Sequence, residues 1–141
     1  MTFTAVIDYG SGNLRSVLNA LKAVRPETEA RIVSSSGDLE TAGRIILPGV
    51  GAFADCMAGL GARPGLLDTL RSQALEARKP FLGICVGMQL LADRGEEDGQ
   101  HQGLGWIPGC VTRLSPASPA LKVPHMGWNT LHFHQPHPLL A

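Results

Sequence analysis

One cysteine lies in a context that favours chemistry. Residues 79–91 have the sequence KPFLGICVGMQLL, in which Cys85 stands between Gly83 and Gly87. The apolar residues before the cysteine predict a strand, and those after it predict a helix. A G-x-C-x-G pattern at such a junction matches the G-x-S-x-G nucleophile elbow, in which small neighbours permit a sharp turn that exposes the nucleophile. We therefore predict that Cys85 is a catalytic nucleophile.

The predicted position also suits a reactive thiol. In an open parallel sheet the chemistry is found at the carboxyl ends of the strands, and a helix amino terminus favours the thiolate that attacks. Cys56 and Cys110 have no such context, so we expect them to be small buried residues, as most free cysteines are. Three widely spaced cysteines form neither a disulfide framework nor a metal-ligand pattern, and no metal or cofactor is expected.

An attacked amide also needs hydrogen-bond donors for its developing oxyanion. The backbone N–H of Val86, directly after the nucleophile, is well placed to be one of them. The glycine-rich segment LPGVGAF at 47–53 follows another apolar stretch, and its N–H groups at Val50 or Gly51 are candidates for the second donor. An ordinary turn explains that segment equally well. Gln89 lies one helical turn beyond the nucleophile, where its amide either enters the same pocket or faces solvent.

Strands and helices are predicted to alternate over the first 93 residues. Apolar stretches predict strands at 3–8, 29–35, 44–49 and 80–84. Helical spacing or helix-compatible composition predicts helices at 14–24, 37–43, 64–78 and 86–93. Because the strands are apolar throughout, both faces of the sheet should be covered. The predicted fold is α/β, a doubly wound, mostly parallel sheet of the flavodoxin-like kind, with an antiparallel extension in the Gly- and Pro-rich last third.

Composition excludes several classes of function. The chain has 141 residues, 44% of them hydrophobic, which suits a single domain over residues 1–141. Twelve basic and twelve acidic residues give a formal charge of zero, which argues against nucleic acid or an anionic membrane as partner. The first ten residues lack the features of a signal peptide, so we expect a cytoplasmic protein.

Five motifs together resemble the class I glutamine amidotransferases. They are IDYGSGNLRSV at 7–17, ILPGVGAF at 46–53, FLGICVGMQLL at 81–91, GLGWIPG at 103–109 and KVPHMGWN at 122–129. The cysteine motif identifies the class, while the first and last motifs resemble those of the glutaminase subunits of imidazole glycerol phosphate synthase. The resemblance covers essentially the whole chain.

The resemblance implies a glutaminase of histidine biosynthesis. Cys85 would form a γ-glutamyl thioester with glutamine, and the released ammonia would pass to a cyclase subunit with a (β/α)₈ barrel in a heterodimer. The loop at Gly51 and the side chain of Gln89 would bind glutamine. The motif at 124–129 would face the cyclase, although a turn tryptophan that closes a small core is the alternative for Trp128. The implied interface residues are Pro124, His125, Met126, Gly127, Trp128 and Asn129.

The catalytic base departs from the family pattern. The family completes its triad with a histidine and a glutamate two residues apart near the carboxyl terminus, and no such pair occurs before Ala141. Leu139 stands where a glutamate should follow His137, so we do not assign His137 to catalysis. Without a base we expect slow turnover from a carboxyl-terminally incomplete domain. The remaining histidines are not predicted to be ligands: His101, His125, His132 and His134.

Two other interpretations remain open and a third is excluded. A truncated, inactive docking module would keep the surface that binds the cyclase and leave the thiol idle. Another hydrolase of the same fold would use the elbow on a different substrate, because elbow geometry alone does not select one. Dinucleotide binding through GSGNLR at 10–15 fails, because Arg15 occupies the position where that fingerprint requires glycine.

Overall fold

A four-stranded parallel sheet forms the centre of the molecule. A computed structural model describes residues 2–118 and 120–136, and its main sheet has the strand order β2-β1-β3-β4. The strands are β1 (Thr4–Ile7), β2 (Ala30–Val33), β3 (Arg44–Gly49) and β4 (Phe81–Cys85). All neighbouring pairs in this sheet are parallel. The predicted mostly parallel sheet is therefore confirmed, and each strand lies within or next to its predicted range.

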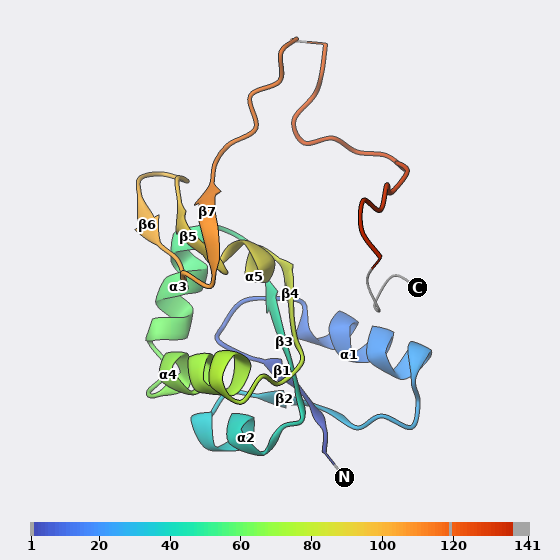
Figure 1. The fold of residues 1–141 in the computed structure, drawn as a ribbon, viewed down its shortest axis with the longest axis vertical. Helices are drawn as coiled ribbons and strands as arrows, with labels where there is room; N and C mark the ends of the chain where they lie inside the picture. Colours follow the sequence, from blue (N-terminus) through green and yellow to red (C-terminus); the bar gives the residue numbers. More distant parts are fainter. Residues whose placement is uncertain (1, 119, 137–141) are drawn as a thin grey trace.

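Helices cover both faces of this sheet, as Figure 1 shows. Helix α1 (Leu14–Val24) lies on one side. On the other side lie α2 (Ser36–Thr41), α3 (Phe53–Gly61) and α4 (Leu66–Arg71), which continues as the π-helical turn η1 (Ser72–Glu76). The doubly wound architecture is confirmed, but α3 was not predicted, because its glycines at both ends hid a helix behind an apparent loop.

The hydrophobic core lies mainly between the sheet and helices α2 to α4. Ile7, Ile45 and Leu47 project from β1 and β3 and are almost completely buried against leucines of the covering helices. These leucines are Leu39, Leu60, Leu66 and Leu70. Helix α1 has no fully buried residue, and an apolar groove of about 420 Å³ separates it from Ile46, Leu82 and Ile84 of the sheet. The β3–β4 end of the sheet is thus packed more tightly on its α3 side.

The helix that follows Cys85 is shorter than predicted. Helix α5 spans only Val86–Gln89, whereas the residue pattern predicted a helix to residue 93. The carbonyl groups of the next three residues accept hydrogen bonds from the segment at 104–107 and not from a further helical turn. The carbonyl of Leu90 accepts from Leu104, and that of Leu91 accepts from Trp106 and Ile107, at 2.8 to 2.9 Å. Tertiary pairing therefore ends the helix and begins a strand.

A second, smaller sheet follows the first one. It consists of β5 (Ala92–Gly95), β6 (His101–Gln102) and β7 (Ile107–Val111). Strand β5 pairs antiparallel with β6 and parallel with β7, so the extension is mixed, and the expected antiparallel sheet is correct only for one pair.

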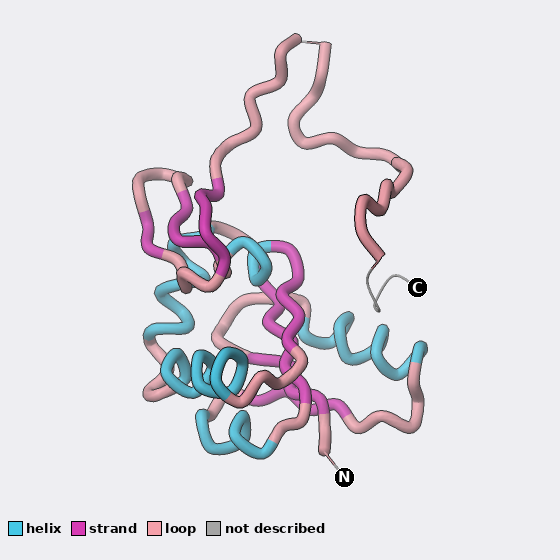
Figure 2. Tube along the Cα trace, in the orientation of Figure 1, coloured by secondary structure: helices cyan, strands magenta, loops and turns pink. Residues whose placement is uncertain are grey.

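Beyond Val111 the described residues, 112–118 and 120–136, form neither helix nor strand (Figure 2). The antiparallel extension predicted for the last third is therefore wrong for these residues. Every residue from 120 to 136 is exposed, and we call this segment the exposed arm. In Figure 1 residues 112–118 run away from both sheets, and the exposed arm leads back towards α1. Without a neighbouring strand, its alternating apolar residues have no ladder to join. None of the helices in the described part of the chain is long and apolar enough to span a membrane.

Candidate active site

Cys85 occupies the turn between β4 and α5. It is the last residue of β4, lies opposite Gly49 of β3 and exposes its thiol. Its backbone has φ 56° and ψ −121°, a region that residues with a Cβ rarely adopt. Such a conformation costs on the order of 1–3 kcal/mol and persists only where the surrounding structure enforces it. The turn at Cys85 therefore lowers the stability of the fold and projects this side chain from the sheet.

Close backbone contacts enforce the turn. A Cβ added to Gly87 would collide with the carbonyl oxygen of Leu47 on β3, and one added to Gly83 would lie 2.6 Å from the Cα of Met88. A Cβ on Gly49 would lie 2.5 Å from the backbone nitrogen of Gly87. These distances are too short for any side chain. Both glycines of the G-x-C-x-G pattern, together with Gly49, therefore let α5 pack directly on the end of β3.

The loop after β3 has one of its candidate donors already engaged. The N–H of Val50 donates to Oγ of Ser11 at 3.0 Å, and the hydroxyl of Ser11 donates to the carbonyl of Val50 at 2.7 Å. Gly51 has φ 91°, and within residues 2–118 and 120–136 its N–H has no hydrogen-bond acceptor. Val86 begins α5, where first-turn N–H groups have no partner within the helix. Gly51 and Val86 are thus the available donors in this conformation.

Two buried side chains, Cys56 and Tyr9, make polar contacts with this loop and with the end of β3. The thiol of Cys56, which is buried as expected, lies 3.4 Å from both Oγ of Ser11 and the carbonyl oxygen of Val50. The hydroxyl of Tyr9 donates to the carbonyl of Pro48 at 2.7 Å. Burial, followed by the neighbouring Cys56, raises the pKa of Tyr9 above its ordinary value, so its phenol stays protonated and continues to donate.

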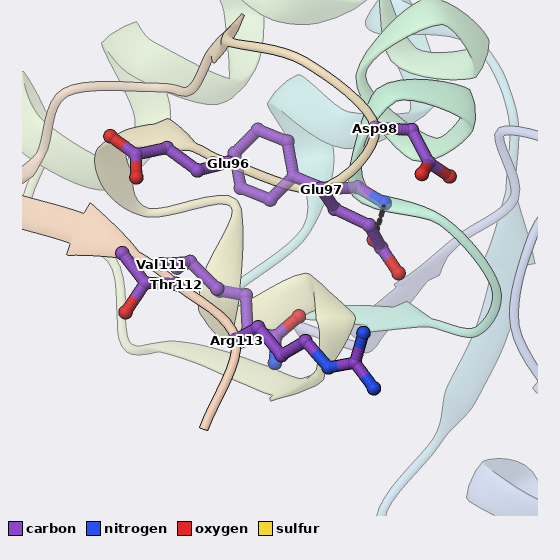
Figure 3. A pocket seen from close by; sticks show the side chains of 9 residues that line it. Glu96, Glu97, Asp98, Val111, Thr112 and Arg113 are labelled. Atoms are coloured by element: carbon purple, nitrogen blue, oxygen red, sulfur yellow. Dashed lines mark hydrogen bonds between the residues drawn. The ribbon is translucent and has the colours of Figure 1, made fainter. Parts of the chain in front are cut away.

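Gln89 lines a polar pocket next to the elbow. The pocket has a volume of about 350 Å³ and takes its charged lining from Glu96, Glu97, Asp98 and Arg113 (Figure 3). A carboxylate oxygen of Glu97 accepts a hydrogen bond from the N–H of Phe53, the first residue of α3, at 2.9 Å. Cys85 does not line the pocket itself, and helix α5 connects the two. Nothing in the residue pattern indicated Glu97, because the polar segment at 94–103 has the composition of an ordinary surface loop. Arg113 lies outside this segment and outside every motif, so the pattern did not indicate it either.

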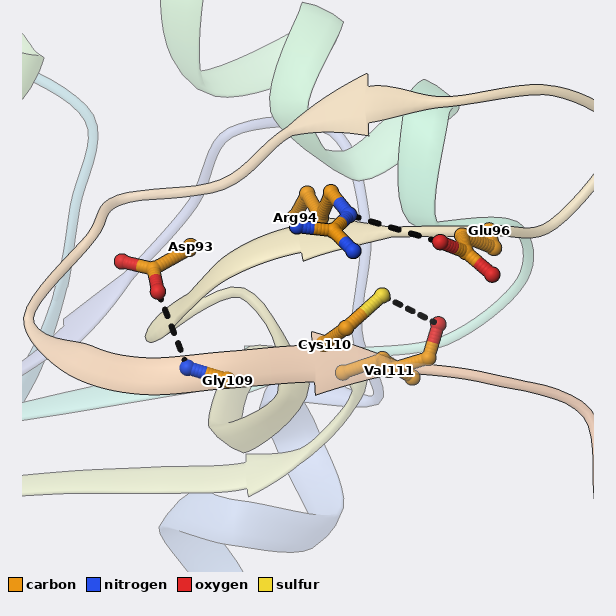
Figure 4. A network of polar contacts seen from close by, with 6 residues as sticks. All are labelled: Asp93, Arg94, Glu96, Gly109, Cys110 and Val111. Carbon is orange, nitrogen blue, oxygen red and sulfur yellow. Dashed lines mark hydrogen bonds and ion pairs between the residues drawn. The ribbon is translucent and has the colours of Figure 1, made fainter.

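Cys110 belongs to a separate polar network on the second sheet (Figure 4). It is half-buried on β7, beside an ion pair between Arg94 and Glu96 at 3.3 Å. The backbone N–H of Gly109 donates to the carboxylate of Asp93 at 2.9 Å. Desolvation, followed by the carboxylate of Glu96, raises the pKa of Cys110.

The other candidate residues lie apart from the elbow. The residues at 124–129 are all on the exposed arm, and Trp128 is completely exposed, so it does not close a core here. His101 lies near the carbonyl of Asp98 at 3.4 Å, while His125, His132 and His134 are exposed. His137 falls outside the described residues. Across those residues no cluster of three potential metal ligands occurs.

Comparison with known proteins agrees with the fold and the motifs. The family model for glutamine amidotransferase class-I matches residues 5–141. The chain therefore belongs to the class-I glutamine amidotransferase family, and the resemblance predicted from its motifs is confirmed at this level. A crystal structure of a glutamine amidotransferase superposes with a TM-score of 0.62 over 77% of this chain and 56% of that one, at 24% identity, which supports the fold.

Curated relatives within the family carry a more specific name. Imidazole glycerol phosphate synthase subunit HisH of Zymomonas mobilis is 57% identical to this chain, and the match covers 96% of this chain and 65% of the relative. The subunit of the same name from Rhodospirillum rubrum is 56% identical over 97% of this chain and 66% of the relative, and that of Mesorhizobium japonicum is 48% identical over 97% and 65%. The chain thus spans about 65% of the length of these relatives.

Proposed function

We propose that this chain provides the glutaminase site of an imidazole glycerol phosphate synthase in histidine biosynthesis. The observation that carries the proposal is the exposed Cys85 on a strained strand-to-helix turn, next to the end of β3, whose following loop holds a Gly51 N–H without an acceptor among the described residues. The name shared by the relatives, at 57% and 56% identity, supports the choice of this synthase within the family. These matches do not favour a docking module with an idle thiol or a different elbow hydrolase.

The proposed reaction begins with attack of the Cys85 sulfur on the carboxamide carbon of glutamine. The carbonyl oxygen becomes an oxyanion, which the N–H groups of Val86 and the loop at Gly51 stabilise. The amide nitrogen takes up a proton, and the carbon–nitrogen bond breaks. Ammonia is released, and the γ-glutamyl group remains bound to Cys85 as a thioester. Water then attacks the thioester carbonyl, releases glutamate and returns the thiol. Both proton transfers need a base, and none of the four histidines among the described residues lines the pocket.

The pocket beside α5 suits the amino-acid end of glutamine. Its carboxylates, Glu97 among them, are placed to attract an α-ammonium group, and the guanidinium of Arg113 matches an α-carboxylate. The amide of Gln89 comes from the helix that directly follows the nucleophile and can hydrogen-bond the substrate between these charges. We therefore propose Gln89, Gly51 and Val86 as substrate-binding residues, with Val50 as a donor that is engaged elsewhere in this conformation.

The partner proposed for this chain is a cyclase subunit with a (β/α)₈ barrel, which would receive the ammonia in a cytoplasmic heterodimer. The exposed arm supports this proposal, because Met126 and Trp128 are among the most exposed large apolar residues of the described chain, at 87% and 103%. Exposed aromatic and methionine side chains are enriched at protein interfaces. The proposed interface consists of residues 124–129.

The glutaminase site is tested by covalent labelling. A diazo-ketone analogue of glutamine should modify the wild-type chain once, at Cys85, as located by peptide mass spectrometry. Cys85→Ala should abolish the labelling and Cys110→Ala should preserve it, because Cys110 lies in another network. Equal labelling of the two thiols would contradict the proposal. Glutamate release measured with and without the cyclase then tests the coupling.

The partner surface is tested by titration with the cyclase subunit. Trp128→Ala should weaken binding by at least tenfold, as for an aromatic residue central to an interface. Leu114→Ala is a matched control, because Leu114 is also exposed, at 72%, but lies outside the arm. Unchanged affinity in Trp128→Ala would remove this residue from the interface.

A further inference from the structure

We propose that Ser11 is a positioning residue of the oxyanion loop, whose hydroxyl masks the N–H of Val50 and so slows acylation of the nucleophile. The inference rests on the proposed glutaminase function. Ser11 lies in the loop between β1 and α1 and is 39 positions from Val50 in the sequence.

The first observation is that one hydroxyl binds two successive peptide groups. Oγ of Ser11 accepts a hydrogen bond from the N–H of Val50 at 3.0 Å, and this N–H is part of the peptide group between residues 49 and 50. The hydroxyl donates to the carbonyl oxygen of Val50 at 2.7 Å, and this carbonyl is part of the peptide group between residues 50 and 51. A rotation of either peptide would break one of these hydrogen bonds. Both polar groups of Val50 are therefore held by the side chain of Ser11, and the thiol of Cys56 adds a second contact to the carbonyl.

The second observation is that the hydroxyl makes two hydrogen bonds to Val50 and has a thiol as a third polar neighbour. A serine hydroxyl offers one donor and two acceptor lone pairs. In this structure the donor goes to the carbonyl of Val50, one lone pair takes the N–H of Val50, and the thiol of Cys56 lies 3.4 Å from the same oxygen. Because Cys56 is buried, its thiol cannot exchange this partner freely for water. In this conformation the hydrogen bond to Ser11 therefore occupies the N–H of Val50.

The consequence concerns the oxyanion. A donor that is already paired cannot stabilise a developing charge, and one oxyanion donor is worth roughly 10²- to 10³-fold in rate. Val50 can contribute only in those molecules in which its hydrogen bond to Ser11 is open. Breaking an ordinary hydrogen bond of this kind shifts an equilibrium by roughly three- to tenfold. Removal of the hydroxyl should therefore raise the rate of acylation by about that factor.

The experiment compares wild type, Ser11→Ala and Ser11→Thr. Ser11→Ala should release ammonia from glutamine in the first turnover three to ten times faster than wild type, at an unchanged half-saturating glutamine concentration, because Ser11 does not line the substrate pocket. Ser11→Thr keeps the hydroxyl at a half-exposed position and should restore the wild-type rate. Hydrogen exchange at the Val50 amide should be accelerated in Ser11→Ala alone.

Alkylation of Cys85 by iodoacetamide is the matched control. It displaces iodide without forming an oxyanion, so its rate should be equal in all three proteins. A first-turnover rate in Ser11→Ala that is equal to or lower than that of wild type overturns the role of Ser11 and leaves the proposed function standing. Absence of ammonia from wild type, with normal alkylation, contradicts the proposed function and this inference with it.

Discussion

The backbone strain at Cys85 can be measured by comparing two substitutions that both remove the thiol. Cys85→Ala keeps a Cβ at φ 56° and ψ −121°, whereas Cys85→Gly removes it. These angles are close to the mirror image of an ordinary extended conformation, which glycine adopts as readily as its mirror image. The glycine variant should therefore be more stable than the alanine variant, the reverse of the usual order.

The expected difference follows from two opposing contributions. A residue with a Cβ in such a region costs about 1–3 kcal/mol. Glycine has more conformational freedom in the unfolded chain, which reduces the gain by about 0.4–1 kcal/mol. The net advantage of glycine is therefore about 0–2.6 kcal/mol, with a centre at about 1.3 kcal/mol, and each kcal/mol corresponds to about 4 °C in Tm.

Urea unfolding followed by circular dichroism measures this difference, with equal slopes required for the two variants. Ala20→Gly in α1 is the control, because Ala20 is exposed on a regular helix and its replacement should cost about 1 kcal/mol. If Cys85→Gly were no more stable than Cys85→Ala, the turn would not be strained and the elbow would be an ordinary strand end.

Three further results are expected. Gly87→Ala should lower the free energy of unfolding by about 2–3 kcal/mol, because backbone atoms cannot make room for the new methyl group, whereas Gly37→Ala in α2 meets no atom within 4 Å and should be neutral or stabilising; both are measured by urea unfolding. Timed iodoacetamide labelling of the native chain should modify half-buried Cys110 before buried Cys56, and the reverse order would contradict the packing behind the loop. Because the pKa of Tyr9 is raised in the folded chain, its contribution to stability is complete below the unfolded value of about 10 and declines as the pH rises above it, so wild type should lose more stability than Tyr9→Phe between about pH 10 and pH 11.

The residue pattern predicted those elements whose local signals agree with their surroundings. The apolar run at 44–49 has the composition of a strand that is buried on both faces, and it forms β3. The leucines of 14–24 recur at helical spacing, and this segment forms α1. The segment VGMQLLAD behaves differently: it has helical character, yet its helix ends after four residues and β5 begins at Ala92. Its carbonyls pair with residues more than ten positions further on, and no local rule contains that information.

The same distinction applies to the candidate site. Gly83 and Gly87 around Cys85 are local, so the strand-to-helix turn could be predicted from spacing alone. Whether Val50 or Gly51 has a free N–H depends on a serine 39 positions away, and spacing left that choice open. The charged pocket residues likewise meet only because the second sheet brings Val111 and its neighbours against the segment that follows β5.

The glycine contact between α5 and β3 has a consequence for engineering this site. Because Gly49 and Gly87 meet backbone to backbone, no side chain lies between them where the helix that follows Cys85 meets the strand that leads into the oxyanion loop. Their spacing is therefore determined by main-chain dimensions, which no substitution at a neighbouring position can widen or narrow by a fraction of an ångström. Libraries that aim at new substrates should leave this joint untouched and vary the rim, where Gln89 and Arg113 line the pocket.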